Sequence, residues 1–109
     1  MAYDEDLAER LREIVAGERG VTEKKMFGGL AFLINGHMSV SASGKGGLML
    51  RCDPERTDEL LARPEAKPFE MRGRSMDGWL RVETDGMSDK ALREWAKHGI
   101  EYANSLPPK

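Results

Sequence analysis

Hydrophobic and polar positions recur along the chain with two periods, one typical of helices and one typical of strands. Near the start, the apolar residues Leu7, Leu11, Ile14 and Val15 are spaced so that they share one side of a helix. This spacing predicts a first helix over residues 4–17. Acidic residues in its first turn would favour the helix dipole.

Two further helices are predicted by the same reasoning. A last helix would begin after Ser88, a favoured N-cap residue, and end before Pro107. Its apolar stripe consists of Leu92, Trp95, Ala96, Gly99, either Tyr102 or Ala103, and Leu106. Gly99 in the middle predicts that this helix lies close to the sheet or to a partner. A short helix is expected over residues 55–62, with Asp53 as its cap.

Between these helices, short runs of strand-forming residues are bounded by turn-forming residues. They predict strands over residues 21–27, 30–34, 37–41, 48–52, 68–72 and 79–83. The first run contains the polar stretch 22–25, which is less typical of a strand. The expected element order is α-β-β-β-α-β-β-α. It predicts an α+β fold in one domain over residues 1–109, with an antiparallel sheet of about five strands and helices packed on one face.

The sequence Asn35-Gly36 predicts a type I′ turn between the two central strands, because both turn residues must adopt positive φ. The expected cross-strand pairs are Ile34–His37, Leu33–Met38, Phe32–Ser39 and Ala31–Val40. One face of this hairpin would then carry the apolar residues Ala31, Leu33, Met38 and Val40. Leu30 and Phe32 would lie on the other face, which we expect to be only half covered.

Glycines mark the other turns. Gly28-Gly29 predicts a turn or bulge between neighbouring strands. Residues 44–47 read Gly-Lys-Gly-Gly, but a phosphate-binding loop requires a following helix, and here a strand follows. A hairpin turn is therefore expected. Residues 73–78 are predicted to form a long exposed loop between the last two strands.

Composition places the chain among ordinary soluble proteins. Of its 109 residues, 39% are hydrophobic and 33% charged, and the only cysteine is Cys52. No apolar run approaches the length of about 20 residues that a membrane-spanning helix needs. The acidic N-terminus lacks the features of a secretory signal, so a cytoplasmic location is expected. The net charge of −2 conceals a basic segment, residues 21–52, with four basic side chains and one acidic.

The residue types that carry catalysis are sparse. Cys52, His37 and His98 lie far apart in the sequence and show neither a catalytic nor a metal-binding spacing. We therefore predict no catalytic, metal or cofactor-binding residues. A cleft that gathers Cys52 or a histidine with a carboxylate would instead favour a small enzyme.

Several motifs resemble the N-terminal domain of the TfoX/Sxy competence regulators. They are Met26-Phe27-Gly28-Gly29, Gly47-Leu48-Met49-Leu50-Arg51, the segment 71–82 and the closing helix over 95–103. The resemblance covers residues 5–106 and implies an α+β fold related to secretion chaperones. Full-length members help to switch on competence genes together with a cyclic-AMP-responsive activator, and they carry a second, C-terminal domain. This sequence ends at Lys109, so a stand-alone N-terminal domain is expected. The family supplies no catalytic residues.

These observations favour a small non-enzymatic regulatory module, a homodimer that binds another protein through the half-covered face at Leu30 and Phe32. The alternative is a weak nucleic-acid-binding protein. Its basic surface would consist of Lys24, Lys25, Arg72, Arg74 and Arg81, if the first and last strands brought their ends together.

Overall fold

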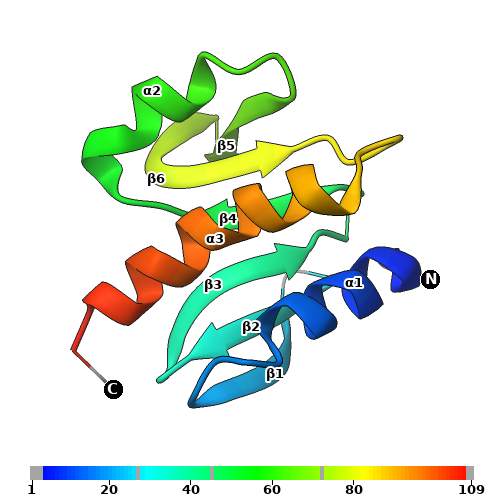
Figure 1. The fold of residues 1–109 in the computed structure, drawn as a ribbon. Coiled ribbons are helices and arrows are strands. Elements are labelled where there is room, and N and C mark those ends of the chain that lie inside the picture. Colours follow the sequence, from blue (N-terminus) through cyan, green and yellow to red (C-terminus); the bar gives the residue numbers. More distant parts are fainter. Residues whose placement is uncertain (1–3, 27, 45, 72, 108–109) are drawn as a thin grey trace.

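The computed structural model describes residues 4–26, 28–44, 46–71 and 73–107; for residues 26, 71 and 74–77 it describes the backbone only. Helices and strands occupy most of this length (Figure 1). They are α1 (Glu5–Val15), β1 (Val21–Met26), β2 (Gly29–Ile34), β3 (His37–Ala42), β4 (Leu48–Arg51), the 3-10 helix η1 (Pro54–Arg56), α2 (Thr57–Leu61), β5 (Ala66–Met71), β6 (Arg74–Val82) and α3 (Asp89–Ser105).

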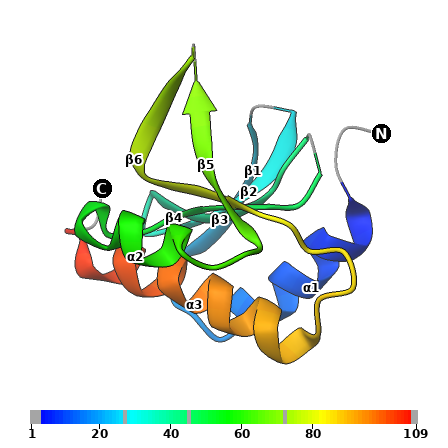
Figure 2. The same cartoon turned by 90° about the horizontal axis from the view of Figure 1, so that it is seen from above.

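The described strands form one sheet of six strands in the order β1-β2-β3-β4-β6-β5, and all neighbouring strands are antiparallel. The three α-helices lie on one face of this sheet (Figure 2). The predicted α+β fold is therefore confirmed. Its element order matches the prediction except that four strands rather than three precede α2, so the sheet has six strands instead of about five.

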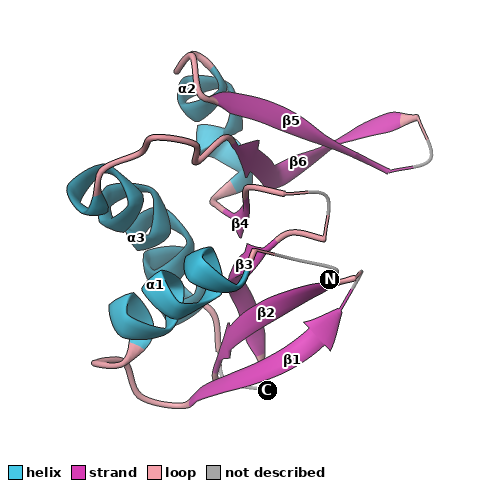
Figure 3. Ribbon diagram, turned by 90° about the vertical axis from the view of Figure 1, so that its right-hand side faces the viewer, coloured by secondary structure: helices cyan, strands magenta, loops and turns pink. Residues whose placement is uncertain are grey.

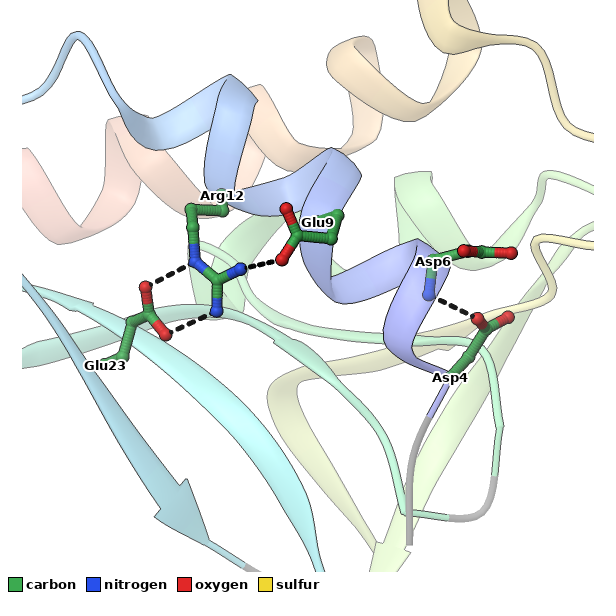
Figure 4. Close-up of polar contacts among 5 residues, drawn as sticks. All are labelled: Asp4, Asp6, Glu9, Arg12 and Glu23. Atoms are coloured by element: carbon green, nitrogen blue, oxygen red, sulfur yellow. Dashed lines mark hydrogen bonds and ion pairs between the residues drawn. The ribbon is translucent and has the colours of Figure 1, made fainter. Parts of the chain in front are cut away.

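Side-chain caps precede α1, η1 and α3, and two of them, Asp53 and Ser88, are the predicted cap residues. Ser88 Oγ accepts a hydrogen bond from Ala91 N at 3.1 Å, and the Asp53 carboxylate accepts one from Glu55 N at 2.9 Å. At α1, the Asp4 carboxylate accepts from the backbone nitrogens of Asp6 and Leu7 (Figure 4). Each cap satisfies N–H groups that have no partner within the helix.

Helix α3 lies close to the centre of the sheet, as Gly99 predicts. A Cβ atom at residue 99 would lie 2.3 Å from the carbonyl oxygen of Ser39 on β3. Trp95 and Ala96 on the same helix are fully buried in the core between helices and sheet. The glycine therefore allows the helix backbone to approach the strand backbone.

The central hairpin follows the predicted turn but not the whole predicted register. Asn35 and Gly36 have φ values of 53° and 87°, as a type I′ turn requires. The pairs Ile34–His37 and Leu33–Met38 are confirmed, whereas Phe32 pairs with Val40 and Ala31 with Ser41. Ser39 is therefore an extra residue in β3, a β-bulge, and its hydroxyl donates to the carbonyl oxygen of Phe32 at 2.8 Å.

The bulge and the helices correct the predicted faces of the hairpin. Val40 lies in the main core beside Phe32, rather than with Ala31 and Met38. Leu30 and Phe32 are 6% and 0% exposed, because helices α1 and α3 cover their side of the sheet. The prediction of a half-covered face at Leu30 and Phe32 is wrong.

The predicted long loop over residues 73–78 is also wrong, because β6 begins at Arg74 and β5 ends at Met71. Gly78 lies within β6, with a φ of 84°. Its N–H donates to Thr57 Oγ1 at 2.8 Å, and its carbonyl accepts from Cys52 N at 2.7 Å. These bonds fasten the middle of β6 to the segment that follows β4.

Candidate interaction face

The side of the sheet opposite the helices, here called the open face, carries a second and smaller apolar cluster. Ala31, Met38 and Met49 form its buried centre. Leu33, Phe69 and Trp79 pack around them and are only partly buried. The hairpins β1–β2 and β5–β6 both extend away from the helices (Figure 3), so this cluster lies between two hairpins. The partly buried side chains give the open face an apolar contact surface.

A row of paired residues crosses the open face from one edge of the sheet to the other. Directly paired residues of antiparallel strands point to the same face, so the pairing defines the members of the row. They are Lys24, Ala31, Ser41, Met49, Arg81 and Lys67, one from each strand. The row has small and apolar residues at its centre and cations towards both ends.

Arg51 adds another cation beside the apolar cluster. It pairs with Trp79, and its guanidinium carbon lies 5.6 Å from the centre of the Trp79 ring. The same carbon lies 5.3 Å from the ring of Tyr102 on α3. Phe69 contacts the Trp79 ring from another side, with ring centres 6.2 Å apart. These contacts hold Arg51 and Trp79 in place.

The cations of the open face differ in their partners. Lys67 Nζ contacts a carboxylate oxygen of Glu83 at 2.5 Å, and this hydrogen bond lowers the pKa of Glu83. Lys24, Arg51 and Arg81 have no carboxylate within 4.0 Å among the described residues. Among the described residues, the open face therefore carries positive charge that no ion pair neutralises.

The structure does not assemble the predicted basic surface. Lys24 and Lys25 lie on β1, and three strands separate them from Arg81 on β6. Lys25 pairs with Leu30 and so lies on the helix side of the sheet. Arg72 lies outside the described residues, and only the backbone of Arg74 is described. The first strand, β1, is an edge of the sheet, whereas the last strand, β6, lies between β4 and the other edge strand β5, so the first and last strands do not meet.

A pocket at the C-terminal end of α3 brings together residues that are distant in sequence. Its volume is about 160 Å³. Its lining residues are Cys52, Asp53, Arg56, Leu60, His98, Glu101, Tyr102 and Ser105. It therefore gathers Cys52 and His98 with carboxylates, the arrangement that would favour an enzyme.

The electrostatics of this pocket do not activate the thiol. Cys52 is 1% exposed, and burial raises the pKa of its thiol. Burial, together with the nearby charge of Arg56, lowers the pKa of His98. Both groups are thus held in their uncharged forms, whereas a nucleophilic cysteine needs a depressed pKa and a nearby positive charge. His37 lies elsewhere, with Nε2 at 2.5 Å from the Pro107 carbonyl oxygen, to which it donates.

The described residues form neither a metal-binding cluster nor a membrane-spanning helix. Within the described ranges, no three His, Cys, Asp or Glu side chains lie together as a metal site would require. None of the described helices is both long and apolar enough to cross a bilayer.

Sequence reasoning missed the open face because its strands are apolar on both sides. In Leu48-Met49-Leu50, the leucines enter the main core and Met49 the smaller cluster, so no alternation of polar and apolar residues is visible. One signal was available in the sequence. Trp79 and Arg81 are two residues apart, with Leu80 between them, so a strand places the aromatic ring and the cation on the same side of β6.

Comparison with known proteins agrees with this architecture. The family model of the TfoX N-terminal domain matches residues 13–103, from within α1 to within α3, and so spans all six described strands. Comparison with curated proteins gave no match. The motifs, the element order and this match lead to one assignment: the chain belongs to the TfoX N-terminal domain family.

Proposed function

We propose that this chain is a non-enzymatic regulatory module of the cytoplasm that acts by binding other proteins, in the control of competence genes or a similar set. The observation that carries the proposal is the open face, with its partly buried Leu33, Phe69 and Trp79 and its unpaired cations. Family membership supports a regulatory role. The uncharged Cys52 and His98 speak against catalysis in the pocket at α3.

We also propose that the module is a homodimer that pairs through β1. This strand is an edge of the sheet, and the other edge strand, β5, contains Pro68, which has no N–H to donate. Antiparallel pairing of β1 with a second copy, centred on Lys24, sets Glu23 opposite Lys25 of the second copy. Because the dimer has two-fold symmetry, it contains two such Glu–Lys pairs, which attract, and a single Lys24–Lys24 pair, which repels.

A complementation experiment tests the regulatory role. Transcripts are compared between cells with and without the chain, and then after expression of the parent protein or of a variant. We expect Trp79→Asp on the open face to fail to restore the transcript pattern. Cys52→Ala and His98→Gln in the pocket should restore it, because a binding module does not need their chemistry.

The control for this experiment is thermal unfolding of each purified variant, which separates loss of function from loss of fold. Failure of folded His98→Gln to restore the transcripts would contradict the non-enzymatic role. An unchanged transcript pattern in cells that lack the chain would contradict the regulatory role itself.

The nucleic-acid alternative would require Lys24 and Lys25 to act with Arg81 across the three strands that separate β1 from β6. It is retained below as an outcome of the binding experiment.

A further inference from the structure

We infer that the open face binds an acidic, extended segment of a partner protein. This inference rests on the proposed function and adds the surface and the chemistry of the partner. Carboxylates of the segment would pair with Lys24 and Arg81. Its apolar side chains would contact the partly buried side chains of Leu33, Phe69 and Trp79.

The geometry of the face suits an extended chain. The row from Lys24 to Lys67 runs across the strands, and its apolar members lie between its cations. An extended segment could follow this row between the two hairpins (Figure 3) if the side chains on the side that faces the sheet are apolar at its centre and acidic towards its ends. The apolar contacts would cover side chains that are now partly exposed, which favours binding.

Charge complementarity selects the partner. Lys24 is exposed on the edge strand, and neither it nor Arg81 has an ion-pair partner among the described residues. Glu83 and Asp85 line a hollow together with Lys67 and Arg81, so an acidic segment would reach Arg81 from the Met49 side. The open face of a second copy would bring cations against cations, so a second copy bound there is disfavoured.

Two observations favour an acidic peptide over a nucleic acid. Base stacking needs a free aromatic face, but the Trp79 ring already contacts Arg51 and Phe69. The chain has a net charge of −2, and its α1 carries exposed carboxylates, which repel a long polyanion. A short acidic segment interacts mainly within the screening length of about 8 Å and is less affected by those distant charges.

Binding of a synthetic probe tests the inference. The probe is a short fluorescein-labelled peptide with Ser at every second position, so that one side of the extended chain carries Leu and Phe flanked by Glu, and its matched control has Gln in place of each Glu. Fluorescence polarisation at low and moderate salt gives the affinities. We expect the acidic peptide to bind more tightly than the Gln peptide, and salt to weaken its binding. Arg81→Glu and Lys24→Glu should each weaken it about tenfold, as expected for loss of a charge pair of about 1.4 kcal/mol.

The matched control variant is Lys90→Glu, which makes the same charge change at an exposed position of α3, on the other side of the sheet. It should leave peptide affinity unchanged. Tryptophan emission gives a second readout, because Trp95 is buried in the main core and Trp79 lies on the open face. Peptide binding should therefore change the emission of Trp79.

Three results would overturn the inference. They are equal affinity for the acidic and Gln peptides, equal effects of Lys90→Glu and Arg81→Glu, or tighter binding of a single-stranded oligothymidine that the same open-face variants abolish. The last result would assign the face to nucleic acid instead. None of these results would alter the transcript experiment, so failure of this inference is distinguishable from failure of the proposed function.

Discussion

At the scale of single residues, Gly99 determines how closely α3 can lie on the sheet. A glycine inside a helix costs about 1 kcal/mol relative to alanine, so Gly99→Ala would stabilise a helix in isolation. Here a Cβ would lie 2.3 Å from Ser39 O and 3.1 Å from a methyl group of Val40. We expect Gly99→Ala to lower the free energy of unfolding by about 1–3 kcal/mol, because helix and strand must move apart.

Urea unfolding measures this effect, and Gly17→Ala is the control. A Cβ at residue 17 would have no neighbour within 4 Å. The free energy of unfolding of Gly17→Ala should therefore differ little from that of the parent protein. A Gly99→Ala variant as stable as the parent protein would contradict the close approach of α3 to β3.

Glu23 provides a second prediction, because it joins β1 to α1 (Figure 4). The Arg12 guanidinium donates two hydrogen bonds to its carboxylate, at 2.7 Å and 2.8 Å, and also contacts Glu9. The bonds from Arg12 lower the pKa of Glu23. A lowered pKa in the folded state stabilises the protein above the unfolded value of about 4.3, and this stabilisation is lost as the pH falls.

We therefore expect Glu23→Gln to be less stable than the parent protein at neutral pH, and the difference to shrink below about pH 4. Unfolding by urea at several pH values measures the difference. Glu13→Gln is the matched control. Glu13 is exposed on α1, the helix that carries Arg12, and forms no ion pair with another described residue. A deficit in Glu23→Gln that persists or grows at low pH would argue against the pairing with Arg12.

At the scale of elements, β2 separates the main core from the open face. Ile34 is fully buried on the helix side, whereas Leu33 is only partly buried on the open face. Both side chains lose the same number of carbon atoms on truncation to alanine. We expect Ile34→Ala to cost about 2–5 kcal/mol and Leu33→Ala about 1 kcal/mol. Similar costs in urea unfolding would show that the two faces are equally covered.

Much of the fold could be predicted from sequence, and the misses share a physical cause. Helical periodicity, Ser88 and Asp53 located the helices, and Asn35-Gly36 located the central turn, because these signals are local. The bulge at Ser39 was missed, since a serine hydroxyl that bonds the Phe32 carbonyl leaves no mark in a pattern of polar and apolar residues. Which side of β2 the helices cover depends on packing between distant segments.

The candidate site was less predictable than the fold. The basic residues were chosen on the assumption that the first and last strands meet, but the strand order places three other strands between β1 and β6. The pocket brings together Cys52, which follows β4, and His98 on α3. No spacing in the sequence indicates that these two residues lie close together. Long-range pairing is therefore the information that the sequence pattern lacked.

At the scale of the whole molecule, the proposed pairing through β1 has a direct test. Light scattering should give a mass of twice the 12.2 kDa of one chain. Lys25→Glu should shift the protein to the mass of one chain, because Glu23 would then face a glutamate of the second copy. Lys90→Glu on α3 should remain a dimer. A parent protein with the mass of a single chain would contradict the proposed dimer.

The order of strands in the sheet also has a consequence for how the chain folds. Four of its five pairings, β1–β2, β2–β3, β3–β4 and β5–β6, join strands that are consecutive in sequence, so each can form as a hairpin in microseconds. Only β4–β6 joins strands with other elements between them. Closing this pairing carries the largest entropy cost in the sheet. The hydrogen bonds that Gly78 donates to Thr57 and accepts from Cys52 form where β4 and β6 meet. We expect the slowest step of folding to be the docking of a β5–β6 hairpin onto a meander already formed by β1 to β4.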